Sequence, residues 1–177
     1  DTLLHMSARD QRFKAVHRGG PLTLDDHRQL ANWAAECAEH VLHLFTSENY
    51  NDDRPATAIT LARAWTRDET TVGDARNAAF AAHNAARDAN SDAATFAARA
   101  AGHAVATAHM ADHAINAAAY AIKAVISSSD EKDADANEYD WQRQHLPDQI
   151  QELVASAFRQ QYLNLVPVTG SGSDKDT

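Results

Sequence analysis

Hydrophobic and polar positions along this chain recur with the period of an α-helix. Between residues 24 and 46 the apolar side chains return every three or four positions: Leu30, Ala34, Cys37, Val41 and Phe45. No segment alternates with period two for long enough to predict a strand. The pattern predicts an all-α protein, a compact bundle of about five to six helices.

Capping residues place the starts of the predicted helices. Thr23 with Asp26, and Thr71 with Asp74, have the spacing of a capping box, in which a hydroxyl and an acidic side chain satisfy free backbone N–H groups. Ser91 supplies a further cap. Prolines at 55 and 147 suit first helical turns, where no backbone donor is needed. We therefore expect helices over residues 24–46, 55–65, 72–89 and from 147 onward.

The segment from Ala98 to Val125 is dominated by alanine and is predicted to be the centre of the bundle. Alanine has the highest helix propensity and lets neighbouring helices approach closely, so we expect one buried helix of about 28 residues, roughly 42 Å long. His103, His109 and His113 would lie within an arc of about 120° on this helix. The three imidazoles would then share one face.

The flanking segments have different compositions. Residues 1–20 contain a basic cluster, and the break at Gly19-Gly20-Pro21 predicts that they form an arm before a single helical domain at 21–166. Residues 127–140 are acidic and poor in aliphatic side chains, so we expect an exposed connection. Residues 167–177 are predicted to be a disordered tail.

The charge restricts the classes of partner. The chain has 16 Lys and Arg against 25 Asp and Glu, a formal net charge of −9, which argues against nucleic acid or an anionic membrane and allows a basic protein or a cationic ligand. Cys37 is the only cysteine, so no internal disulfide forms. Without an apolar membrane span or signal-peptide pattern, we predict a soluble cytoplasmic protein of unassigned oligomeric state.

A pair on the first helix is a candidate for acid–base chemistry. Glu36 and His40 are four residues apart, so a carboxylate can orient an imidazole that titrates near neutral pH. If this pair faces His103, His109 and His113, the five side chains would form a catalytic seam between helices. The alternative is a partly buried pair that only orients the helix against its neighbours.

Metal and thiol chemistry are weaker candidates. His109 and His113 have the i, i+4 spacing by which a helix presents two imidazoles to a metal, but no third ligand follows nearby in sequence. We therefore expect no metal and no cofactor. Cys37, among alanine and tryptophan on an apolar face, is expected to be an inert buried side chain.

Four further residues are candidates for lining a ligand site: Trp33, Arg76, His83 and Tyr120. Arg76 and His83 lie on one stripe of the helix at 72–89, where Arg76 could instead pair with Glu36 or Glu39. Tryptophans in helical bundles more commonly fill the core than line a pocket, so both roles stay open for Trp33.

Several long strings resemble a known family: RGGPLTL at 18–24, DHRQLANWAAECAEHVL at 26–42, DDRPATAI at 52–59, AARAAGHAVATAHMADH at 97–113, AAAYAIKAV at 117–125 and LPDQIQELV at 146–154. They are similar to the putative immunity proteins of actinobacteria, a small helical family likened to the fifth immunity group of polymorphic toxin systems. The departures are Ile115-Asn116, where Leu-Gly is more familiar, and the acidic stretch at 127–140.

The resemblance implies a protein that binds and neutralises a cognate toxin, and the acidic charge would suit a basic toxin. The polar seam suggests an alternative, a small enzyme or ligand-binding protein that acts on a small molecule. An open cavity lined by the Glu and His side chains would favour the second hypothesis, since an immunity protein binds through its outer surface.

Overall fold

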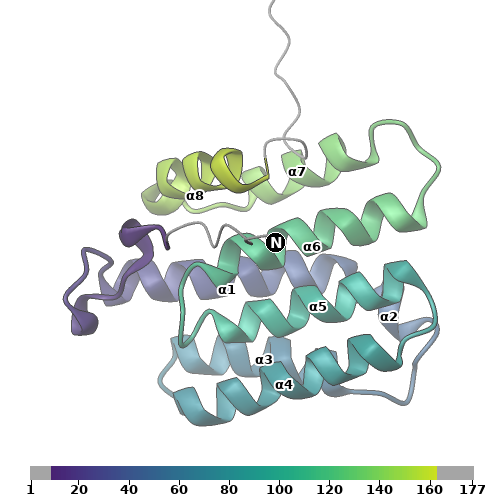
Figure 1. Ribbon diagram of the computed structural model, residues 1–177, viewed down its shortest axis with the longest axis horizontal. Coiled ribbons are helices and arrows are strands. Elements are labelled where there is room, and N and C mark those ends of the chain that lie inside the picture. The colour runs from purple at the N-terminus through teal and green to yellow at the C-terminus, as the bar shows by residue number, and fades with distance from the viewer. Residues whose placement is uncertain (1–8, 163–177) are drawn as a thin grey trace, which may run out of the picture.

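The computed structural model describes residues 9–162 (Figure 1). Its helices are α1 (Leu24–Val41), α2 (His43–Thr46), α3 (Arg54–Thr66), α4 (Val72–Asp88), α5 (Asp92–Ala106), α6 (His113–Ser128), α7 (Ala134–Gln144) and α8 (Asp148–Gln161), preceded by 3-10 turns η1 (Gln11–Phe13) and η2 (Val16–Arg18). The only β-type pairing in this part of the chain is an isolated bridge between Ala15 and Leu22. The all-α prediction is confirmed, and the predicted tail lies outside the described residues.

The hydroxyl half of the predicted helix caps is present. The hydroxyls of Thr23, Thr71 and Ser91 accept hydrogen bonds from backbone N–H groups three residues later, each at 3.1 Å. Pro55 occupies the first turn of α3, and Pro147 immediately precedes α8. Each of these residues satisfies or removes a backbone donor that a helix start leaves free, so these starts are set locally.

The alanine-rich segment is not the single helix that we predicted. α5 ends at Ala106, Thr107 to Asp112 form a turn, and α6 begins at His113. The two helices pack against each other as a hairpin (Figure 1). Threonine, histidine and aspartate are weaker helix formers than alanine, and the hairpin lets two alanine faces bury each other.

The acidic stretch and the first predicted helix also differ from expectation. Residues 134–144 form α7 rather than an exposed connection, and three of its side chains are buried: Ala134, Glu138 and Gln142. The helix predicted at 24–46 is divided at Leu42 into α1 and α2. These divisions and α7 explain why the structure contains more helices than the predicted five to six.

The hairpin of α5 and α6 lies at the centre of the molecule. α3 and α4 lie on one side of it, α1 packs against both of its helices, and α7 and α8 lie beyond α6 on the opposite side from α4 (Figure 1). The apolar face predicted for residues 24–46 is buried, with Leu30 and Cys37 of α1 and Phe45 of α2 fully inaccessible. The small alanine side chains bring the helices close and leave little room for larger groups in the hairpin.

The segment before α1 folds back onto the bundle. Phe13 is fully buried, and Leu22 is 3% exposed. Gly19 has φ +82°, and a Cβ at Gly20 would lie 2.1 Å from the Lys14 carbonyl oxygen. The two glycines thus permit the tight turn that pairs Ala15 with Leu22.

None of the described helices combines the length and the apolar character that crossing a lipid bilayer requires.

Candidate functional site

The structure contains a cavity of about 340 Å³, the histidine pocket, at the junction of α4 with the α5–α6 hairpin. Its lining residues are Arg76, Ala79, Phe80, His83, Ala106, His109 and His113. α4 supplies the first four, α5 contributes Ala106 at its end, and the turn and α6 supply the last two. Arg76 and His83, predicted as ligand-lining residues, both lie in this wall.

Four imidazoles meet at this place. Nδ1 of His103 lies 2.9 Å from Nδ1 of His113, which makes one hydrogen bond between the rings. His83 packs edge-on against His103 with ring centroids 5.1 Å apart, and His109 lies 5.3 Å from His113. The three predicted histidines therefore do converge, although they reach one another across a helical hairpin rather than along one helix.

All four histidines have lowered pKa values. The pKa of His83 and of His109 is about 4, that of His103 is about 3, and that of His113 also lies below its ordinary value. Burial is the main cause in each case, because an imidazolium loses hydration there, and neighbouring cations add to the effect in His83 and His109. The rings are therefore neutral at pH 7.

A glycine and an arginine of α5 hold His83. A Cβ at Gly102 would lie 2.8 Å from Cε1 of the His83 ring, so this glycine makes room for the imidazole inside an otherwise alanine-rich helix. Nη1 of Arg99 lies 3.1 Å from Nδ1 of His83. Since a guanidinium only donates, Nδ1 accepts and Nε2 carries the proton of the neutral ring.

A second cavity, the His40 pocket, has a volume of about 450 Å³ and is lined by Glu36, Glu39, His40, Arg63, Trp141 and His145. Nδ1 of His40 lies 2.8 Å from Oε1 of Glu138, which is 5% exposed. The Trp141 ring stacks on His40 with centroids 3.6 Å apart. The partner of His40 is thus a carboxylate of α7, a helix that we did not predict.

The predicted single seam is divided between these two cavities. Glu36 and His40 line one, His109 and His113 line the other, and the two described cavities share no residue. Glu36 is not the carboxylate that binds His40 in the described structure.

Other predicted residues have mainly structural roles. Trp33 is 3% exposed and its Nε1 donates to the backbone carbonyl of Gln142 at 2.9 Å, so it fills the core. Tyr120 stacks on His103 with centroids 5.2 Å apart, behind the histidine pocket. Burial and the nearby carboxylates of Glu138 and Glu36 raise the pKa of Cys37, so its thiol stays protonated.

The expected ion pair of Arg76 with Glu36 or Glu39 is not formed in the described structure. Arg63, not Arg76, is the partner of Glu39, with its Nη1 2.6 Å from Oε2. Arg76 instead lies in the wall of the histidine pocket. Its guanidinium is therefore available to that cavity.

Two buried polar side chains that we did not predict as functional join distant parts of the chain. His27 is 2% exposed, and its Nε2 lies 2.5 Å from the carbonyl oxygen of Thr107. Gln142 is 1% exposed and donates to the carbonyl of Ala118 at 2.9 Å. Their partners are backbone atoms, which carry no residue-type signal in a sequence.

Within residues 9–162, no group of three or more His, Cys, Asp or Glu side chains is arranged to hold a metal ion.

The structure defines an all-α bundle with two separate histidine-containing cavities. Residues 20–149 match the Imm-5 like putative immunity protein family, and the chain belongs to this family. No curated protein and no solved structure matches the chain.

Proposed function

We propose that this protein binds a cognate toxin, a basic protein, and neutralises it. Membership of the immunity family carries the proposal, and the formal net charge of −9 supports the choice of a basic partner. Opposite charge accelerates the encounter of two proteins and disfavours partners of the same sign.

The loop at residues 47–53, here called the acidic loop, is the proposed site of this contact. Tyr50 is 84% exposed, the most exposed of the large hydrophobic side chains in the described chain, and Glu48 and Asp53 lie exposed on either side of it. Tyrosine is frequent among the residues that dominate binding energy at interfaces. A basic surface could pair with the carboxylates while Tyr50 is buried.

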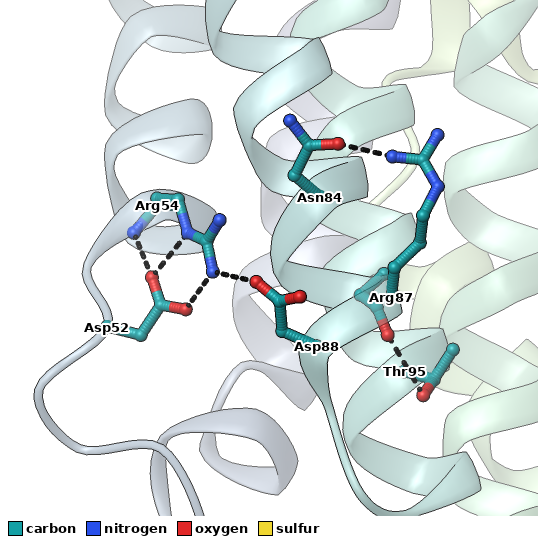
Figure 2. A network of polar contacts seen from close by, with 7 residues as sticks. Asp52, Arg54, Asn84, Arg87, Asp88 and Thr95 are labelled. Carbon is teal, nitrogen blue, oxygen red and sulfur yellow. Dashed lines mark hydrogen bonds and ion pairs between the residues drawn. The ribbon is translucent and has the colours of Figure 1, made fainter.

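Ion pairs hold the acidic loop in place. Figure 2 shows Arg54 between Asp52 and Asp88, with Nη2 2.7 Å from Oδ2 of Asp52 and 2.9 Å from Oδ2 of Asp88. These contacts lower the pKa of Asp52 and tie the start of α3 to the end of α4. At the other end of the loop, Ser91 donates to Glu48 at 2.8 Å. A loop ordered in advance loses less entropy on binding.

The test is co-expression of the chain, in a bacterial host, with each toxin domain encoded in its source genome. We expect growth to be rescued from one such toxin, and the triple variant Glu48→Lys, Tyr50→Ala, Asp53→Lys to lose the rescue. The control variant Asp130→Lys, Glu131→Lys makes the same two charge changes at another exposed site and should keep it. Failure to rescue growth from any toxin would refute the proposed function.

A second candidate function, binding of a small molecule, is supported by the histidine pocket. Its volume of about 340 Å³ lies within the range of ligand sites. Acid–base catalysis has less support, because efficient catalytic groups have pKa values near the working pH and these imidazoles have values of about 3 to 4. The cavity is therefore better suited to binding than to proton transfer.

A further inference from the structure

We propose that the histidine pocket binds a small organic anion, in which a carboxylate or phosphoryl group contacts Arg76 and an apolar body lies against Phe80. The inference rests on the second candidate function, the binding of a small molecule. It does not depend on the neutralisation of a toxin, which would use the outer surface.

The charges around the cavity favour an anion. Among the residues that the structure describes, none with a carboxylate lines the pocket of this acidic protein, whereas Arg76 does. Arg99 of α5 contacts His83, and the positive charge of Arg18 acts on His109. The carboxylate that opposes them is Asp112, and its Oδ2 lies 3.6 Å from Nε of Arg9.

One polar atom beside the pocket also lacks a hydrogen-bond partner. Nδ1 of His109 is buried and has no hydrogen-bond partner, which is rare for a buried polar atom. Nε2 of His83 carries a proton, as its contact with Arg99 requires. In the hydrogen bond between His103 and His113, the ring whose Nδ1 accepts carries its own proton on Nε2. The charge that attracts the anion is therefore that of Arg76, with the neutral imidazoles beside it.

The rest of the pocket wall is apolar and suits an apolar body in the ligand. Phe80 is 60% exposed although its ring is large and apolar, and Ala79 and Ala106 lie in the same wall. A flat hydrocarbon group placed here would cover the phenyl ring. Arg76, four residues before Phe80 on α4, lies on the same side of the helix and can hold the charged end by two parallel hydrogen bonds.

A metal ion fits this place less well than an anion. Neutral imidazoles are good metal ligands, but two arginines beside them would repel a cation. The same arginines attract an anion, and a bound anion would raise the pKa of His109 and His113 toward ordinary values. Binding of the ligand should therefore change the NMR resonances of these histidines.

The experiment titrates the purified full chain at pH 7 with benzoate, phenyl phosphate and benzylamine, and follows the imidazole resonances by NMR. Benzylamine has a similar size and ring but the opposite charge. We expect one or both anions to shift the His83, His109 and His113 resonances at millimolar concentration, and benzylamine to leave them unchanged. The tighter of the two anions identifies the charged group as carboxylate or phosphoryl.

Two variants of α4 complete the test. Arg76→Gln should weaken anion binding about tenfold or more, the expected loss for a charge-assisted pair. Arg87→Gln removes an exposed arginine of the same helix that does not line the pocket, and should bind as the wild type does. Both positions are exposed, so both variants should fold.

Three results would overturn the proposal: no shift with either anion, equal binding of benzylamine, or unchanged binding in Arg76→Gln. Tight binding of Zn²⁺ by the same imidazoles would also overturn it. None of these results bears on toxin neutralisation, which the growth assay measures separately.

Discussion

The histidine pocket and the His40 pocket place the same type of side chain in opposite electrostatic surroundings. In the histidine pocket the imidazoles contact one another and lie near arginines, and burial keeps them neutral. In the His40 pocket an imidazole contacts the buried carboxylate of Glu138. The tertiary fold, rather than the histidine itself, therefore decides whether an imidazole lies beside arginines or beside a carboxylate.

Acid should destabilise the histidine pocket, and this is the largest effect that we expect. The folded-state pKa values of His83, His103 and His109 lie below the unfolded value of about 6.5. Their contribution to stability is thus complete above pH 6.5 and is lost as pH falls toward 4. Between pH 7 and pH 5 the free energy of unfolding should fall by roughly 2 to 3 kcal/mol, allowing for solvent screening at the partly exposed rings.

Urea unfolding between pH 7 and pH 5 measures this loss. His109→Gln should reduce the dependence on pH, because it removes one of the partly buried neutral imidazoles. The carboxylates of Glu39 and Asp52 have lowered pKa values, so their contributions are lost below this window. A stability that is flat from pH 7 to pH 5 would contradict the burial of neutral imidazoles.

Two glycines in helices of the described chain test how His83 is held. Gly102→Ala should reduce stability by about 1 to 3 kcal/mol, because the new methyl group would overlap the His83 ring. Gly73→Ala meets no neighbouring atom closer than 3.8 Å and should raise stability by about 0.5 to 1 kcal/mol through higher helix propensity. Thermal unfolding distinguishes the two signs. A stabilising Gly102→Ala would show that His83 is not seated against α5.

The His40 pocket offers the corresponding test of a paired histidine. Glu138→Ala should reduce stability by about 1 to 2 kcal/mol, because it removes a buried carboxylate that binds His40. Glu39→Ala removes the carboxylate of the more exposed pair with Arg63 and should cost less than about 1 kcal/mol. Chemical unfolding at pH 7 measures both. Equal losses of stability would show that burial of Glu138 does not strengthen its pair with His40.

The helices with strong local signals were predicted well, and the site was predicted only in part. Thr23, Thr71 and Ser91 start helices because their hydroxyls bind N–H groups three residues away, an interaction that the sequence contains entirely. Arg76 and His83 were recognised because both lie on one stripe of α4. The partner of His40 was not recognised, since Glu138 lies 98 residues away in a stretch whose composition suggested an exposed connection.

The helical class, the capped starts of α1, α4 and α5, and the family follow from the sequence alone, because capping, apolar periodicity and long family strings are local properties of the chain. The turn at Thr107 to Asp112 depends on the tertiary structure as well, because the alanine-rich segment could form one continuous helix, and the packing of α5 against α6 favours the break. The tertiary structure also places His83, His109 and His113 around one cavity and His40 beside another. Which side chains meet depends on the packing of helices distant in sequence, and helical periodicity within one segment does not contain that information.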